Sequence, residues 1–167
     1  MFSFDYLVLF KDFPPELATV LIAALPITEL RVSLPMALGI YKMSVVSAYF
    51  WSVIGNIIPI FFILWLLEPV SKLLIRKSKV ADRFFSWLFE RTRSRFSEKY
   101  FKYGEIALVI FVAIPLPMTG GWTGAVAAFL FGIPKKTSFL LIALGILIAG
   151  LIVSLVSVGS LSFIKIF

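Results

Sequence analysis

The chain has 167 residues, of which 60% are hydrophobic and only 15% are charged, and its mean hydropathy is +1.03. Soluble domains carry about 25% charged residues, and a soluble fold of this length cannot bury so much apolar surface, so the composition indicates a single-domain integral membrane protein. The net charge is +7, and the absence of Cys and His excludes thiolate and imidazole metal sites and catalysis that depends on a His base; we expect no metal, no cofactor and no enzymatic activity.

Four apolar stretches follow one another along the chain, and each is long enough for a bilayer core that needs about 20 helical residues. They comprise residues 13–41, 43–67, 106–134 and 137–164. The segment before the first stretch lacks a basic region and carries Asp5, Asp12 and Glu16. It is therefore not predicted to be a cleaved signal peptide.

The first stretch is interrupted by Pro26 and Pro35, which flank Glu29 and Arg31. Proline removes a helix hydrogen bond, and a formal charge near the bilayer centre costs about 2.5–3.5 kcal/mol and usually serves a function. We predict a re-entrant hairpin that turns around residues 29–33, with a half-helix that Ser33 caps and Pro35 opens. The alternative is that the two charges only mark a polar turn between buried segments.

The charged pair has two possible uses. Arg31 beside the positive end of the half-helix would form an anion site, unless it simply pairs with Glu29. Such pairing needs a turned chain, because residues i and i+2 do not face each other on a helix. Apolar surroundings favour the protonated form of Glu29, which suits proton coupling, but Glu29 would serve equally as the counter-ion of Arg31.

The second stretch predicts a continuous helix with a polar turn at Asn56 and Pro59. Asn56 would hydrogen-bond a hairpin tip or take part in ordinary helix packing.

Residues 71–104 form a basic connector. Between Lys72 and Lys102 the chain has ten basic and three acidic residues, which sum to +7. The positive-inside rule explains such a run between apolar spans better than nucleic acid binding does, and it places the loop in the cytoplasm. Its aromatic and aliphatic residues recur at helical spacing, which predicts amphipathic helices on the inner leaflet without a catalytic part.

The third stretch is also broken, by prolines and glycines around residues 115–124. We predict a second hairpin in which Thr119 and Gly120 begin a half-helix with free backbone N–H groups. Trp122 would offer a flat apolar face to a substrate or only pack the hairpin. The predicted substrate-binding residues are Arg31, Ser33, Thr119, Gly120, Gly121, Trp122 and Thr123, supported by Pro35, Asn56, Pro115 and Pro117.

The order broken, continuous, loop, broken, continuous predicts an all-α inverted repeat of re-entrant hairpin plus transmembrane helix, with tips that face each other. The repeats are about 13–68 and 105–165. This topology leaves Lys135 and Lys136 in the cytoplasm, whereas four crossing helices would place them outside, against the usual bias. Two continuous spans enclose two hairpins poorly, so we expect a homo-oligomer.

Three strings resemble the small multidrug export family of prokaryotic membrane proteins: Glu29–Pro35 (ELRVSLP), Gly55–Pro59 (GNIIP) and Ala113–Ala125 (AIPLPMTGGWTGA). That family is similar to the DedA superfamily, and the resemblance implies paired re-entrant hairpins, recycling of polyprenyl-phosphate lipid carriers and proton-dependent transport. DedA proteins carry arginines in the second hairpin region, whereas residues 115–134 contain none, which leaves Arg31 as the deep cation.

We therefore predict a small transporter that moves an amphipathic, anionic lipid-phosphate-type substrate across the cytoplasmic (inner) membrane, with proton coupling through Glu29. It would contact membrane lipids and no nucleic acid. One alternative is a drug/proton antiporter in which Glu29 alternately holds a proton and a lipophilic cation. The other is a non-transporting membrane scaffold.

Overall fold

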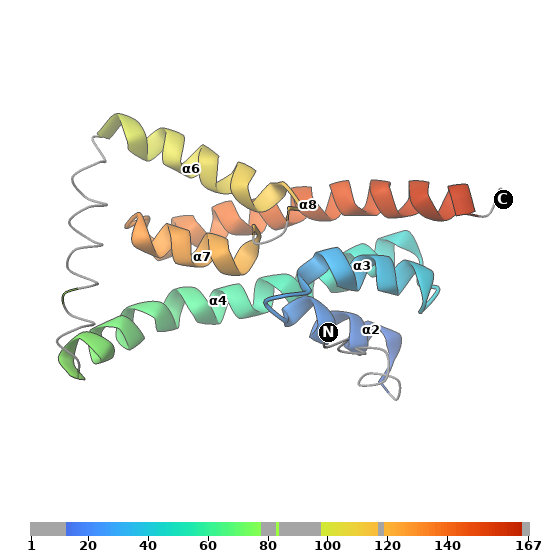
Figure 1. The fold of residues 1–167 in the computed structure, drawn as a ribbon, viewed down its shortest axis with the longest axis horizontal. Helices are drawn as coiled ribbons and strands as arrows, with labels where there is room; N and C mark the ends of the chain where they lie inside the picture. Colours follow the sequence, from blue (N-terminus) through green and yellow to red (C-terminus); the bar gives the residue numbers. More distant parts are fainter. Residues whose placement is uncertain (1–12, 78–82, 84–97, 117–118, 165–167) are drawn as a thin grey trace. The chain divides into compact units, whose positions relative to one another are not determined.

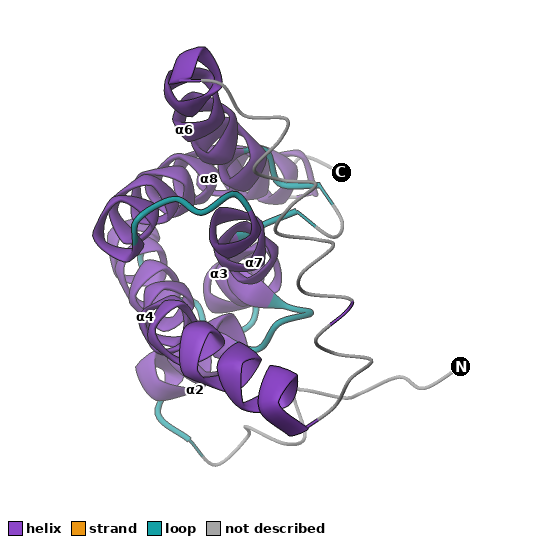
Figure 2. Ribbon diagram, turned by 90° about the vertical axis from the view of Figure 1, so that its left-hand side faces the viewer, coloured by secondary structure: helices purple, strands orange, loops and turns teal. Residues whose placement is uncertain are grey.

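The computed structural model describes residues 13–77, 83, 98–116 and 119–164. Within these ranges the regular elements are all helices and no strand occurs (Figures 1 and 2), which confirms the all-α class. The helices are α2 (Pro15–Ala24), α3 (Glu29–Gly39), α4 (Val45–Lys77), α6 (Glu98–Ala113), α7 (Gly121–Leu130) and α8 (Lys135–Ile164). Pro117, Met118 and most of the predicted amphipathic connector lie outside the described residues.

Two helices are long and apolar enough to cross a membrane, over Val45–Leu73 of α4 and Lys135–Ser160 of α8. The remaining helices have 10 to 16 residues, fewer than the roughly 20 that a spanning helix needs. The prediction of two continuous spans and two broken stretches is confirmed at the level of helix lengths. Re-entry of the broken stretches into a membrane stays a prediction.

The chain divides into two compact units, and both long helices contribute to each. The first unit comprises Met1–Ile58 and Leu147–Phe167, and the second comprises Pro59–Ile146. The first therefore contains α2, α3, the beginning of α4 and the end of α8. The second contains the rest of α4, α6, α7 and the beginning of α8.

In the first unit, α2 and α3 form a pair of short helices (Figure 1). α2 ends because Leu25 has an extended backbone (φ −77°, ψ 141°), the conformation that a following proline, here Pro26, imposes. The turn thus lies before Glu29, several residues earlier than predicted. The expectation that Ser33 caps a half-helix was wrong: α3 begins at Glu29, so Ser33 and Pro35 both lie inside it.

Small residues let the helices of the first unit pack closely. A Cβ atom at Gly55 of α4 would lie 2.4 Å from the carbonyl oxygen of Val20 in α2. A Cβ atom at Gly150 of α8 would lie 2.7 Å from the ring of Tyr49, and the Tyr49 hydroxyl donates a hydrogen bond to the Leu147 carbonyl oxygen (3.0 Å). Both α2 and α8 therefore pack against the beginning of α4.

In the second unit, α6 packs against α7. Cβ atoms at Gly124 of α7 and Gly145 of α8 would each lie less than 3.0 Å from side-chain atoms of Val112. At the far end of α4, Glu68 forms ion pairs with Lys72 (2.7 Å) and with Lys135, the first residue of α8. The end of the first span and the beginning of the second therefore meet within this unit.

Candidate functional site

Buried polar side chains are concentrated in the first unit. Of the ten polar or charged residues that are buried among the described positions, eight belong to it and only Ser71 and Ser138 belong to the second. The eight are Thr19, Thr28, Glu29, Ser33, Ser52, Asn56, Ser154 and Ser157. Because burying a polar group is costly unless it is hydrogen-bonded or used, this interior is where we look for chemistry.

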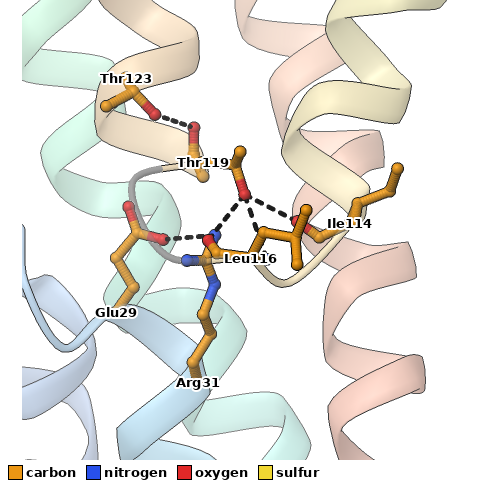
Figure 3. A network of polar contacts seen from close by, with 7 residues as sticks. Glu29, Arg31, Ile114, Leu116, Thr119 and Thr123 are labelled. Atoms are coloured by element: carbon orange, nitrogen blue, oxygen red, sulfur yellow. Dashed lines mark hydrogen bonds and ion pairs between the residues drawn. The ribbon is translucent and has the colours of Figure 1, made fainter.

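Glu29 and Arg31 form an ion pair (Figure 3), with 3.8 Å between Arg31 Nη2 and Glu29 Oε2. The Glu29 side chain is only 7% exposed, whereas that of Arg31 is 21% exposed. Glu29 has φ of +46°, so the chain departs from helical geometry there and side chains two residues apart can meet. The predicted pairing at a turn is present.

A hydrogen bond joins α3 to α4 beside this pair. The hydroxyl of Ser33 donates to that of Ser52 (2.9 Å). A short connection over residues 40–44 links the two helices, so their contacting parts run antiparallel. One turn back from Ser33 lies Glu29, and one turn on from Ser52 lies Asn56. The register thus places Asn56 at the level of Glu29.

Asn56 is 1% exposed, and its Oδ1 atom has no hydrogen-bond partner in the described structure. Buried acceptors of this kind are uncommon and call for an explanation, such as a water, an ion or a change of state. The hydroxyl of Ser154 on α8 is also buried without a partner there.

The second hairpin tip is held by one threonine. Thr119 Oγ1 lies 2.8 Å from the carbonyl oxygens of both Ile114 and Leu116 (Figure 3) and accepts a hydrogen bond from the Leu116 N–H. Gly120 precedes α7 with φ of 144° and ψ of −166°, a conformation open essentially to glycine alone. Thr123 Oγ1 donates to the Gly120 carbonyl oxygen (3.3 Å). The Thr119 hydroxyl thus shapes the turn.

The first tip uses the same device. The Thr28 hydroxyl donates a hydrogen bond to the Ile22 carbonyl oxygen, and Thr28 is followed by Glu29 with its positive φ. Thr119 is likewise followed by Gly120 with a positive φ. The two tips share a threonine anchor and a left-handed residue after it, although one carries a carboxylate there and the other a glycine.

The structure groups the predicted site residues by unit. Glu29, Arg31, Ser33, Pro35 and Asn56 lie together in the first unit, on α3 and on the part of α4 that packs against it. The described tip residues Pro115, Thr119, Gly120, Gly121, Trp122 and Thr123 lie in the second. The facing of the two tips stays a prediction.

One of the second-tip residues has a packing role. A Cβ atom at Gly121 would lie 2.9 Å from Ile60 and 3.2 Å from Ile146, so glycine permits the start of α7 to pack against α4 and α8. Trp122 is half-buried. Gly121 thus shapes the hairpin, and contact with a substrate remains a prediction for both residues.

Thr28 and Ser52 are not among the predicted site residues. Thr28 had a signal in the chain, because both broken stretches contain the pattern Leu-Pro-X-Thr, which ends at Thr28 and at Thr119. Ser52 had a weaker one, as a polar residue one helical turn before Asn56 in an apolar span. No group of three Asp or Glu side chains that could hold a metal ion occurs among the described residues.

A family model described as "Putative small multi-drug export protein" matches residues 29–152, nearly three quarters of the chain. The chain belongs to this family. The match begins at Glu29 within the first tip and includes the second tip and the whole of α4, and it contains all three strings, which confirms the resemblance. No curated protein and no solved structure matches the chain. Family membership together with the two apolar helices indicates a membrane exporter.

Proposed function

We propose that the protein exports an amphipathic, anionic lipid-phosphate-type substrate across the cytoplasmic membrane in a proton-coupled cycle, in which Arg31 binds the anion and Glu29 carries the proton. The observation that carries the proposal is the position of Glu29. It occupies the left-handed place after the anchoring threonine that Gly120 fills in the other hairpin.

Glu29 is costly to the fold in two ways. A left-handed backbone costs a non-glycine residue about 1–2 kcal/mol, and its carboxylate is buried. Glycine would satisfy the turn without either cost, as Gly120 does. Strain that persists where an unstrained residue would fit points to a function for the side chain.

The polar groups around Glu29 suggest how a proton and an anion would alternate. Ionised Glu29 pairs with Arg31. Protonated Glu29 loses that attraction and gains an O–H donor, and Asn56 Oδ1, at the same level of α4, is an acceptor without a partner in the described structure. Protonation would thus release Arg31 to bind a phosphate, and loss of the proton would re-form the ion pair and expel it.

The ion pair between Glu68 and Lys135 supports the re-entrant topology. If Val45–Leu73 and Lys135–Ser160 each cross once, this contact places the end of the first span and the start of the second on one side of the membrane. The intervening α6 and α7 would then return to the side from which they left. The basic residues near that end favour the cytoplasmic side for it, and an inverted repeat of DedA type would follow.

The test is transport into proteoliposomes that contain the purified full-length protein, with a fluorescent short-chain polyprenyl phosphate as the probe and an imposed pH gradient. We expect Arg31→Ala to abolish transport and Glu29→Gln to abolish its dependence on the gradient. The matched controls Lys42→Gln and Glu16→Gln change the same charges at exposed positions and should transport normally. Full activity of Arg31→Ala would refute the proposal.

A drug/proton antiporter is the second candidate, because the family description names multidrug export. In that case Glu29 alternates between a proton and a lipophilic cation, and Arg31 serves only to hold it. Efflux of a cationic dye would then require Glu29, persist in Arg31→Ala and outpace the phosphate probe.

Three further expectations belong to the proposal. The tip with Thr119 and Trp122 would form the opposite wall of the substrate path, in a homo-oligomer without enzymatic activity. Chemical cross-linking in native membranes tests the oligomer. A non-transporting scaffold predicts that Glu29→Gln and Arg31→Ala are both silent while substitutions in the basic connector are not.

A further inference from the structure

The second unit contains a cavity that the proposed export cycle does not use. Its volume is ≈ 490 Å³, within the range of about 300–1,000 Å³ that is typical of ligand pockets. It lies between the end of the first span, the end of α7 and the start of α8. The lining includes Leu64, Glu68, Lys72, Phe129, Ile133 and Lys135.

The two ends of this cavity differ in chemistry. Leu64 and Ile133 are 4% and 8% exposed, and with Phe129 they provide an apolar wall. At the other end, Lys72 and Lys135 each contact one carboxylate oxygen of Glu68. Both Glu68 oxygens are therefore occupied by ammonium groups, and the three side chains together leave one positive charge.

The location adds to this charge. Lys72 and Lys135 lie at the ends of the two candidate spans, where a bilayer gives way to water. Lys135 is also the first residue of the 30-residue helix α8, so the positive end of a long helix dipole points to the same place. An apolar wall together with two lysines near the ends of the candidate spans is complementary to a lipid with an anionic headgroup.

We propose that this cavity binds an anionic phospholipid from the membrane, with the phosphate held by Lys72 and Lys135 and an acyl chain lying against Leu64, Phe129 and Ile133. The ammonium groups keep N–H donors beyond those that contact Glu68, because each has three. The site is separate from Glu29 and Arg31, which belong to the first unit, and it does not depend on what the protein exports.

Photo-crosslinking in nanodiscs tests this site. The full-length protein is placed in phosphatidylcholine nanodiscs with a photoactivatable phosphatidylglycerol as the probe, and the labelled peptides are mapped. We expect labelling in or beside residues 129–135 and about a fivefold weaker apparent affinity for each of Lys72→Gln and Lys135→Gln. Lys136→Gln removes the same charge from an exposed neighbour outside the lining and should leave the affinity unchanged.

Glu68→Gln is the most informative variant, because it should change the affinity for phosphatidylglycerol in the opposite direction to the two lysine variants. Removal of the competing carboxylate should tighten phosphatidylglycerol binding, whereas loss of a merely structural ion pair would loosen it. Equal labelling by a phosphatidylcholine probe, weaker binding in Glu68→Gln, or displacement of the lipid by millimolar inorganic phosphate would overturn the proposal. Unchanged binding in Arg31→Ala is expected and keeps this site distinct from the export site.

Discussion

The two short-helix hairpins share a backbone plan and differ in the chemistry of their tips. In each, a proline follows the end of the first helix, a threonine hydroxyl holds a carbonyl oxygen in that helix or just after it, and the next residue has a positive φ. In the second hairpin that residue is Gly120; in the first it is Glu29, paired with Arg31. The comparison separates what the turn requires from what the site requires, because a glycine is sufficient for the turn and the Glu29 side chain is not needed for it.

The interiors of the two units differ as the tips do, because the first is more polar than the second. Most buried polar residues among the described positions lie in the first unit, including Asn56 with its unpartnered Oδ1 atom. The second unit is packed by glycines against aliphatic side chains such as Val112 and Ile60. The polar chemistry of the described residues is therefore concentrated in the unit that contains the first hairpin.

The largest effect on export is expected from substitution of the residue with positive φ at the first tip. Glu29→Gly gives the first tip the residue of the second, and we expect export to fall at least about tenfold, a barrier increase of about 1.4 kcal/mol. Stability should stay level or rise, because the left-handed strain is removed. Transport in proteoliposomes and unfolding in detergent measure the two effects. At the second tip, Gly120→Ala places a side chain on a residue with positive φ and should destabilise by about 1–3 kcal/mol, and a neutral result there would contradict the shared backbone plan.

Glycine-to-alanine substitutions should have different stability costs in the two units, because the added Cβ atom meets different neighbours. At Gly55 it meets a backbone oxygen of Val20, which cannot move alone, so Gly55→Ala should cost the upper part of the usual 1–3 kcal/mol for overpacking. At Gly124 it meets a methyl group of Val112, and the cost should be smaller. Gly159→Ala, where nothing lies within 4 Å, should be neutral or stabilising and serves as the control. Thermal unfolding gives the order, and an equal cost at 55 and 124 would contradict it.

Removing each threonine hydroxyl should cost more stability at the buried first tip than at the more exposed second tip. Thr28 is 2% exposed, whereas Thr119 is half-exposed and water can replace its hydroxyl. We expect Thr28→Val to cost about 1.5 kcal/mol and Thr119→Val about 0.5 kcal/mol. Ser160→Ala, which removes an exposed hydroxyl from α8, provides the baseline. Chemical denaturation measures both stability costs, and a larger cost for Thr119→Val than for Thr28→Val would contradict this prediction.

The smallest expected change concerns Asn56. Asn56→Leu removes a buried acceptor without a partner and should raise stability by up to about 1 kcal/mol, while it weakens proton-coupled export. Asn56→Asp is the contrasting variant, since it adds a second carboxylate at the level of Glu29 and should destabilise the fold. A loss of stability in Asn56→Leu would show that the amide is structurally satisfied.

Several features of the site followed from local sequence. The run Leu25-Pro26 predicts a helix end, because proline forces the preceding residue out of the helical region. The Gly-Gly pair at 120–121 predicts the second break. The two-residue spacing of Glu29 and Arg31 predicts pairing only where the chain turns, and the structure has both the turn and the ion pair. The misplaced cap at Ser33 shows the limit: Pro35 resembles a helix start in sequence, yet α3 accommodates it internally.

The amino-acid sequence by itself determined the class of protein, the two continuous helices and the two breaks, because composition, helix length and proline sterics act over a few neighbouring residues. The tertiary structure decided the rest. The positive φ of Glu29, the Ser33–Ser52 hydrogen bond that sets Asn56 level with it, and the contact of Glu68 with Lys135 all depend on how the helices pack against one another. Such registers are set by the fit of whole surfaces, which no local pattern specifies.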